Sequence, residues 1–228
     1  MIIDYLGHSA FRIKDYEDTG YQIMLDPYEP DSVPGLLPID LHTTIVLNSH
    51  DHFDHTTTEG IEIRPCEEEC PYDIEVIDCW HDNQQGALRG ANKVHIITLR
   101  ATGEKIVHYG DLGEEIDAFL TPENLEKVKD ATVAMIPVGG YYTIDGHQAF
   151  DLIQKTTPKM ALPMHYRSER MKLGFDELGT VEDFLEYAME NWYEARWSMS
   201  YQFDTLSELQ EGAIVALRPV YAKSLNRH

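Results

Sequence analysis

The sequence predicts an α/β protein that forms a single domain over residues 1–228. Short apolar runs, rich in β-branched residues and bounded by turn residues, recur through the first two thirds of the chain and predict strands. After about residue 114, helical spacing alternates with further apolar runs. No internal repeat or low-complexity linker divides the chain, and its length is enough to bury a sizeable core.

The predicted strands of the first two thirds are short, and turn or loop residues separate them. They cover residues 2–6, 10–13, 22–25, 43–47, 74–77, 93–98 and 106–109. The polar segment 15–20 ends in a glycine and predicts a hairpin turn. Residues 28–38 contain three prolines and a glycine, so we expect an irregular loop there.

The last part of the chain predicts helices and strands in turn. A cap at Thr121, followed by proline and glutamate, predicts a helix that ends near Lys129. The next predicted elements are a strand over 132–137, a helix over 149–155 and a strand over 160–164. A longer amphipathic helix is predicted over 181–194, with Thr180 as its cap. Its apolar stripe includes Trp192, which we expect in the core or in the interface of a homo-oligomer.

Composition and charge exclude several classes of partner. The chain has 40 acidic residues against 18 Lys and Arg, a formal net charge of −22, which argues against nucleic acid or an anionic membrane surface held by general charge. No apolar run approaches the length of a membrane-spanning helix. The first residues carry no signal-peptide pattern, and the three cysteines do not form a disulfide framework. We therefore expect a cytoplasmic protein.

The strongest chemical signal is the segment 49–55, directly after a predicted strand. It places His50, His52 and His55 together with Asp51 and Asp54 within six positions. Residues two apart in an extended segment point to the same side, so His50 and His52 can face one ion while Asp54 and His55 face a second. Imidazole and carboxylate ligands suit zinc, manganese or ferrous iron. The competing interpretation is a solvated polar loop.

Two metal ions need more ligands than this segment offers. Three further candidates follow predicted strands: His81, Asp111 and His165. Each of them alone is explained as well by a local structural role as by metal binding. Their joint placement at strand ends is what predicts a metal site.

These residues carry a resemblance to a known family. His50-x-His52-x-Asp54-His55, followed in order by His81, Gly110-Asp111 and His165, resembles the metallo-β-lactamase superfamily of hydrolases. A closer resemblance, to its ascorbate-6-phosphate lactonase-like branch, rests on Leu6-Gly7-His8-Ser9, Asp26-Pro27, Arg89-Gly90-x-Asn92 and the segments 108–113, 137–145 and 163–166. It covers about residues 1–170. The family's fold is a four-layer αββα sandwich of two mixed sheets, with helices outside and metal ligands along one edge.

The resemblance also implies a ligand set and a reaction. One metal would be held by His50, His52 and His81, and the other by Asp54, His55 and His165, with Asp111 bridging them. Asp54 would also handle a proton as the catalytic residue. Two divalent cations, zinc before manganese or iron, would then hydrolyse a lactone, ester or phosphoester of a small molecule.

Alternatives remain open at this stage. A phosphodiesterase or nuclease acting on small nucleotides fits the same machinery, and so does a metal-binding or sensing protein without turnover. An oxidoreductase branch of the family has glutamate at the position of His52 and carries a flavodoxin domain, so this sequence favours hydrolysis.

Several polar residues near the motifs are candidates for a supporting role. Arg89 and Asn92 are candidates for binding an anionic group of the substrate. Tyr142 and Thr143 lie in a loop after a buried strand and are candidates for the substrate wall. His8 can support the metal ligands or cap the first strand, and the two interpretations have about equal weight; Asp26 can orient a ligand histidine, but an Asp-Pro turn also explains it.

Overall fold

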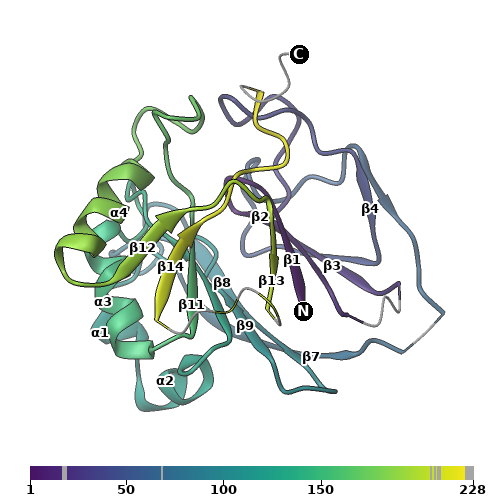
Figure 1. The fold of residues 1–228 in the computed structure, drawn as a ribbon, viewed down its shortest axis with the longest axis horizontal. Helices are drawn as coiled ribbons and strands as arrows, with labels where there is room; N and C mark the ends of the chain where they lie inside the picture. The colour runs from purple at the N-terminus through teal and green to yellow at the C-terminus, as the bar shows by residue number, and fades with distance from the viewer. Residues whose placement is uncertain (17–19, 68, 206, 208, 210–211, 224–228) are drawn as a thin grey trace.

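The computed structural model describes residues 1–16, 20–67, 69–205, 207, 209 and 212–223. Two mixed β-sheets pack face to face around one hydrophobic core (Figure 1). The helices lie on the outer side of the larger sheet. The predicted α/β sandwich of two mixed sheets is therefore confirmed, with the described helices on one of its two outer faces.

The smaller sheet contains the N-terminal strands. Its order is β13-β1-β2-β3-β5, antiparallel except for the parallel pair β3 and β5. Its strands are β1 (Ile2–Gly7), β2 (Ala10–Lys14), β3 (Gln22–Leu25), β5 (Ile45–Leu47) and β13 (Gln202–Asp204). The segment predicted as one strand over 43–47 is divided, because β4 (Leu41–Thr43) pairs with β6 (Ile61–Ile63) whereas β5 pairs with β3.

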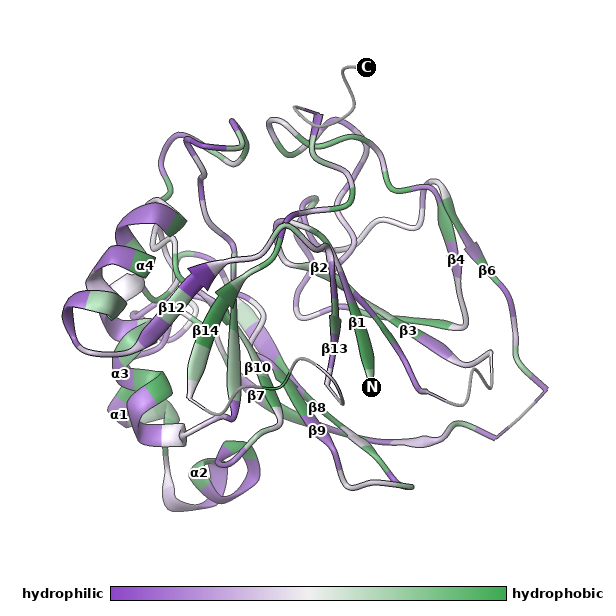
Figure 2. Cartoon of the chain, viewed as in Figure 1, coloured by the Kyte–Doolittle hydropathy of each residue, from purple (hydrophilic) through white to green (hydrophobic). Residues whose placement is uncertain are grey.

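The larger sheet has the order β12-β14-β11-β10-β9-β8-β7. Its strands are β7 (Tyr72–Trp80), β8 (Ala91–Leu99), β9 (Lys105–His108), β10 (Val133–Pro137), β11 (Met160–Met164), β12 (Glu194–Trp197) and β14 (Ala213–Ala216). Strands β9 to β12 and β14 run parallel, and β7 and β8 are antiparallel additions. The central strands β10, β11 and β14 are buried throughout and strongly apolar (Figure 2), as expected for parallel strands covered on both faces.

Four helices are described: α1 (Ile116–Phe119), α2 (Pro122–Val128), α3 (Gly146–Thr156) and α4 (Val181–Glu190). The predicted caps are confirmed, because the Thr121 and Thr180 side chains accept hydrogen bonds from the first turns of α2 and α4. Within the described residues, the smaller sheet carries no helix on its outer side, and the ribbon of β4 and β6 lies beside it (Figure 1). None of the described helices is long and apolar enough to cross a membrane.

The segment after α4 departs from the sequence-based expectation. Helix α4 ends at Glu190, four residues before the predicted end, because the chain turns back into β12. Trp192 adopts a left-handed backbone conformation in this turn and is 97% exposed, so it does not belong to the core stripe. The sequence pattern predicts no element after residue 194, yet β12, β13 and β14 complete both sheets. The predicted hairpin turn over 15–20 includes residues 17–19, which lie outside the described residues.

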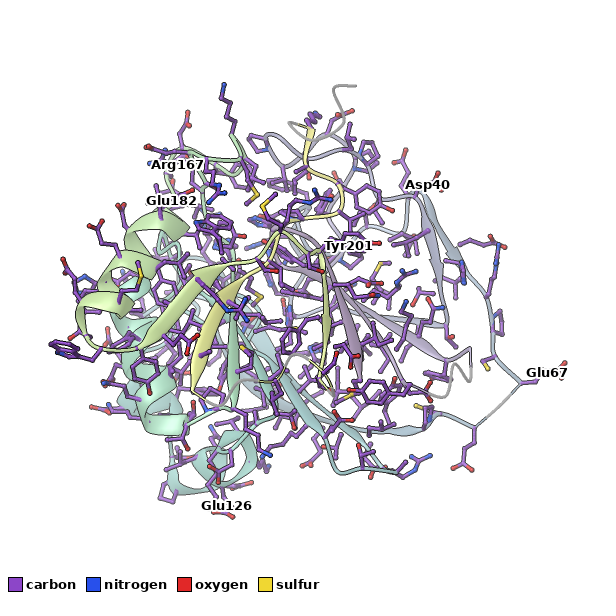
Figure 3. The ribbon with its side chains drawn as sticks, viewed as in Figure 1. Asp40, Glu67, Glu126, Arg167, Glu182 and Tyr201 are labelled. Atoms are coloured by element: carbon purple, nitrogen blue, oxygen red, sulfur yellow. The ribbon has the colours of Figure 1, made fainter. Side chains whose placement is uncertain are left out.

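Acidic side chains lie around the periphery of the molecule, as Glu67 and Glu126 show in Figure 3, where both point away from the core. Both are exposed. The excess of negative charge therefore stays in contact with water, where it costs little.

Candidate metal centre

The predicted metal ligands come from loops at the carboxyl ends of strands. His50, His52, Asp54 and His55 follow β5, and His81, Asp111 and His165 follow β7, β9 and β11, respectively. These strands belong to both sheets, and their ends meet at one edge of the sandwich. The structure brings all seven predicted ligands together.

Asp111 lies at the centre of this group. Its Oδ2 atom is 3.1 Å from Nε2 of both His81 and His165, 3.3 Å from Nε2 of His55 and 3.8 Å from Nε2 of His50. The carboxylate is almost completely buried. One carboxyl oxygen therefore lies close to four imidazole nitrogens, a donor set that suits divalent cations.

The backbone before Asp111 is suited to this close approach. Gly110 has a φ of +54°, and a Cβ atom there would lie 2.4 Å from Cβ of Ser49. Only glycine fits that contact, which lets the loop of Asp111 approach the histidine segment.

The remaining ligands form two clusters beside Asp111. In the first cluster, His50, His52 and His81 each offer a nitrogen, and the three atoms lie within 4.8 Å of one another. The second cluster meets the same limit and contains His8, Asp54, His55 and His165. The division matches the predicted pair of sites, with His8 as an additional member.

The electrostatics of the centre keep its carboxylates ionised but act differently on its histidines. Burial acts to lower the pKa of both His55 and His81, but Asp111 outweighs it and raises both pKa values. Burial and the neighbouring His55 lower the pKa of His50 to about 3, so its imidazole is neutral near pH 7. Burial acts to raise the pKa of Asp111, but the imidazoles of His165, His55 and His81 outweigh it and hold that pKa well below its usual range. Burial also acts to raise the pKa of Asp54, but the hydrogen bond with His8 outweighs it and lowers the pKa. Neutral imidazoles and ionised carboxylates are the forms that bind cations.

The buried polar atoms at the centre that have no hydrogen-bond partner among the described residues include Nε2 of His50, Nε2 of His55 and Oδ1 of Asp111. Leaving a buried acceptor unpaired costs about 1–3 kcal/mol. Divalent cations between the two clusters would satisfy these atoms. The donor set of imidazole nitrogen and carboxylate oxygen therefore fits the implied metals.

Asp26 supports the histidines from behind. Its Oδ2 atom lies 2.8 Å from Nδ1 of His55, and its two oxygens accept hydrogen bonds from the backbone N–H and the hydroxyl of Ser49 at 2.6 and 2.5 Å. The Ser49 hydroxyl lies 2.9 Å from Nδ1 of His50. Of the two interpretations for Asp26, the structure favours orientation of ligand histidines.

His8 also belongs to the centre. Its Nε2 atom is 3.2 Å from Oδ2 of Asp54, and its ring centroid is 4.6 Å from that of His165. The His8 carbonyl accepts a hydrogen bond from the backbone N–H of His165 at 3.0 Å. His8 therefore positions two residues of the second cluster in addition to ending β1.

A family model described as "Beta-lactamase superfamily domain" matches residues 2–165, which is more than half of the chain. The chain belongs to the β-lactamase superfamily. The motif-based resemblance to that superfamily is confirmed, and the narrower one, to the lactonase-like branch, stays a prediction.

Curated relatives and solved structures agree with this placement. A UPF0173 metal-dependent hydrolase of Carboxydothermus hydrogenoformans is 22% identical over 200 residues, covering 74% of this chain and 85% of the relative. One from Hyperthermus butylicus is 26% identical over 199 residues, covering 73% and 83%. A metallo-β-lactamase superfamily protein from Thermotoga maritima superimposes with a TM-score of 0.67 at 24% identity, over 95% of this chain and 97% of that one. A metallo hydrolase from Ignicoccus hospitalis gives 0.57 at 18% identity, over 97% and 95%.

In this β-lactamase superfamily chain, the centre opens into a cavity of about 300 Å³. His52, Asp54, His81, Asp111 and His165 line its floor. Phe53, Arg89, Tyr141, Phe175 and Leu178 contribute to its wall, with Glu177 beside them. Sequence reasoning missed Phe53, although it lies inside the motif, and Phe175, which lies beyond the recognised segment.

Of the four predicted substrate-binding residues, only Arg89 lines this cavity; Tyr142 lies beside it, with its ring centroid 4.3 Å from the guanidinium carbon of Arg89. Asn92 is fully buried, and its side chain donates to the Tyr109 carbonyl at 2.9 Å and accepts from the Asp111 backbone N–H at 3.0 Å. Thr143 is buried and donates to the Gly140 carbonyl at 2.8 Å. Asn92 thus positions Asp111, and Thr143 closes a turn, so neither side chain faces the cavity in this structure. A sequence pattern does not reveal that such amide and hydroxyl groups are satisfied by nearby backbone.

Proposed function

We propose that the chain is a metal-dependent hydrolase that cleaves a lactone, ester or phosphoester of a small molecule. The observation that carries the proposal is the Asp111 carboxylate, placed among four imidazoles at the floor of an open cavity. The name "metal-dependent hydrolase" shared by the curated relatives supports it. The acidic surface and a cavity at the small end of ligand sites favour a small substrate over a nucleic acid.

The ligands would divide between two divalent cations. His50, His52 and His81 would hold one, and Asp54, His55 and His165 the other, with Asp111 shared. Zinc suits the imidazole-rich first cluster, and manganese or iron also suits the mixed second cluster. When bound, the cations would supply hydroxide near neutral pH and stabilise negative charge that develops on the substrate.

The protein's own side chains would control protons and orientation. The Asp54 carboxylate lines the cavity and is partly accessible, so its Oδ2 atom is placed to accept a proton during hydrolysis. His8, at 3.2 Å from that oxygen, holds the carboxylate in place. Asp26 fixes the ring of His55 through Nδ1, which leaves Nε2 for a cation.

The test is metal content and activity on the same preparations. We would purify the wild type and an Asp111→Asn variant without chelator, count metal by mass spectrometry, and assay a lactone, a carboxyl ester and a phosphodiester. We expect about two metals per chain in the wild type, with metal and activity lost together in the variant. His147→Ala is a matched control, because His147 stacks on Tyr187 and lies outside both clusters.

Each outcome separates the proposals. Unchanged metal content in Asp111→Asn would contradict the ligand assignment. Metal bound by the wild type without turnover of any substrate would support a metal-binding or sensing protein instead. Turnover confined to the phosphodiester would favour an enzyme that acts on small nucleotides.

A further inference from the structure

Arg89 lies at the mouth of the cavity and is held there by aromatic rings. Its guanidinium carbon is 4.3 Å from the ring centroid of Tyr142 and 5.9 Å from that of Tyr141. The side chain is exposed and lines the same cavity as His52 and His81. Stacking on an aromatic face restrains a guanidinium. Its N–H donors point outward in the plane of the guanidinium, so they remain free to bind a ligand.

Among the described residues, Arg89 has no ion pair with a carboxylate. Four other arginines, Arg12, Arg64, Arg100 and Arg167, each have an Asp or Glu partner within 3.1 Å. A charged arginine presents five N–H donors and no acceptor. Those of Arg89 remain available to a ligand in the cavity.

The loop that carries Arg89 is ordered by one buried carboxylate. Asp82 accepts backbone N–H groups from Gln84 and Gly86 on Oδ1, at 2.8 and 3.0 Å, and from Leu88 and Arg89 on Oδ2, at 2.9 and 2.7 Å. Asp82 directly follows the predicted metal ligand His81 in the chain. The position of Arg89 is therefore tied to that of the first cluster.

The opposing loop holds its tyrosines in a strained conformation. Tyr141 and Tyr142 both have left-handed backbones, with φ values of +59° and +75°. Such angles are outliers for bulky residues and gather at functional sites. The Thr143 hydroxyl, which donates to Gly140, stabilises this turn and so keeps the Tyr142 ring under Arg89.

The rest of the rim is apolar on one side. Phe53 is 52% exposed, and its ring centroid lies 6.4 Å from that of Phe175. Glu177 contributes a carboxylate to the same lining. A ligand with an apolar body and one anionic group would pack on the phenylalanines and place its charge near Arg89.

We infer that Arg89, stacked on Tyr142, is a specificity-determining residue that binds a carboxylate or phosphate group of the substrate. The inference rests on the proposed hydrolase function and names its substrate class: small organic anions whose scissile bond lies at the metal centre and whose charged group lies at the rim.

The test compares three 4-nitrophenyl esters that differ at the far end of a four-carbon acyl chain. They are the neutral butanoate, the succinate half-ester with a distal carboxylate, and the 4-phosphonobutanoate with a distal phosphonate. We expect the wild type to prefer one or both anionic esters. Arg89→Ala should lower kcat/KM for the preferred anion by roughly 10- to 100-fold, mainly through KM, and change the neutral ester little.

Two further variants sharpen the comparison. Arg89→Lys keeps the charge but loses the planar stack, so it should recover only part of the preference. Arg170→Ala is the matched control, because Arg170 also stacks on an aromatic ring, that of Trp197 at 5.4 Å, but does not line this cavity. It should leave all three esters unchanged.

A binding measurement separates failure of the inference from failure of the proposed function. Calorimetry with the uncleaved amides N-(4-nitrophenyl)succinamic acid and N-(4-nitrophenyl)butanamide needs no turnover. A preference for the acid that disappears in Arg89→Ala supports the anion site even if no ester is cleaved. Equal binding of the two amides by the wild type, or an ester preference unchanged in Arg89→Ala, would overturn the inference whether or not hydrolysis occurs.

Discussion

The two clusters at the metal centre share Asp111 but differ in donors and in burial. The first, His50, His52 and His81, offers only imidazoles, and two of its members are partly accessible. The second adds the Asp54 carboxylate and contains His55, which is fully buried. The second is also more firmly supported, since the carboxylate of Asp26 holds His55 whereas a neutral hydroxyl holds His50.

The two clusters therefore differ in the charge and in the support that they offer to a metal. Burial acts to lower the pKa of His55, but Asp111 and Asp26 outweigh it and raise the pKa well above its usual range. Negative charge around a ligand side chain also favours binding of a cation by that side chain. We therefore expect the second cluster to bind its metal more tightly than the first. Three experiments test this comparison, and a fourth concerns a buried histidine outside both clusters.

The largest effect is expected where the clusters meet. Asp111→Asn removes the charge that both share, so activity should fall by roughly 1,000-fold or more and both metals should be lost or weakened. Steady-state kinetics and metal analysis would check this. Retention of two tightly bound metals would show that Asp111 is not shared.

The second prediction separates the clusters. His81→Ala should leave about one metal per chain, held by the second cluster, whereas His165→Ala should lose the tighter metal. Titration of the wild type with a chelator should release the metals in two steps. If the wild type releases both metals in a single step, and the metal that remains in each variant has the same affinity, the two clusters do not differ in metal affinity and the expectation is contradicted.

The third prediction concerns support from behind the ligands. Asp26→Asn weakens the orientation of His55, so metal affinity of the second cluster should fall roughly 10- to 100-fold. Ser49→Ala removes only the hydroxyl beside His50 and should act mainly on the first cluster, with a smaller effect. Competition with a metal indicator dye measures both. Equal losses in the two variants would contradict the comparison.

The smallest effect is expected from His95, a buried histidine outside both clusters. Burial and the neighbouring His108 lower its pKa to about 4 in the folded protein, below the unfolded value near 6.5. The unfolded state thus binds more protons between these values, and stability falls as pH drops from about 6.5 towards 4, by on the order of 2–3 kcal/mol. His95→Phe should reduce this slope in urea unfolding followed at several pH values. If the dependence of the free energy of unfolding on pH is the same in His95→Phe and the wild type, His95 does not contribute to the loss of stability at low pH.

Much of the centre was predictable because its chemistry is concentrated at strand ends. His50 to His55 lie in one short segment, and Asp111 and His165 follow apolar runs that the β-branched pattern identifies. Caps such as Thr121 were also visible, since a cap and its helix are neighbours in the chain. What was not predictable depends on distant contacts.

Asn92 and Tyr142 illustrate this limit. Both stand in motifs near the ligands, but Asn92 is buried and used by the backbone, whereas Tyr142 stacks on Arg89 at the rim. Similarly, β13 joins the smaller sheet by pairing Asp204 with Ile2, a contact between opposite ends of the chain. A local pattern does not specify which strand a short segment will pair with.

Local periodicity and residue chemistry are enough to predict the α/β fold class, the order of most strands and helices, and the seven candidate ligands, and the ligand motifs carry the family resemblance. Tertiary structure alone decided which side chains share one pocket. Two sheets packing face to face place Asp111 among imidazoles from three other loops, and burial then decides which polar groups face the cavity and which are satisfied by backbone.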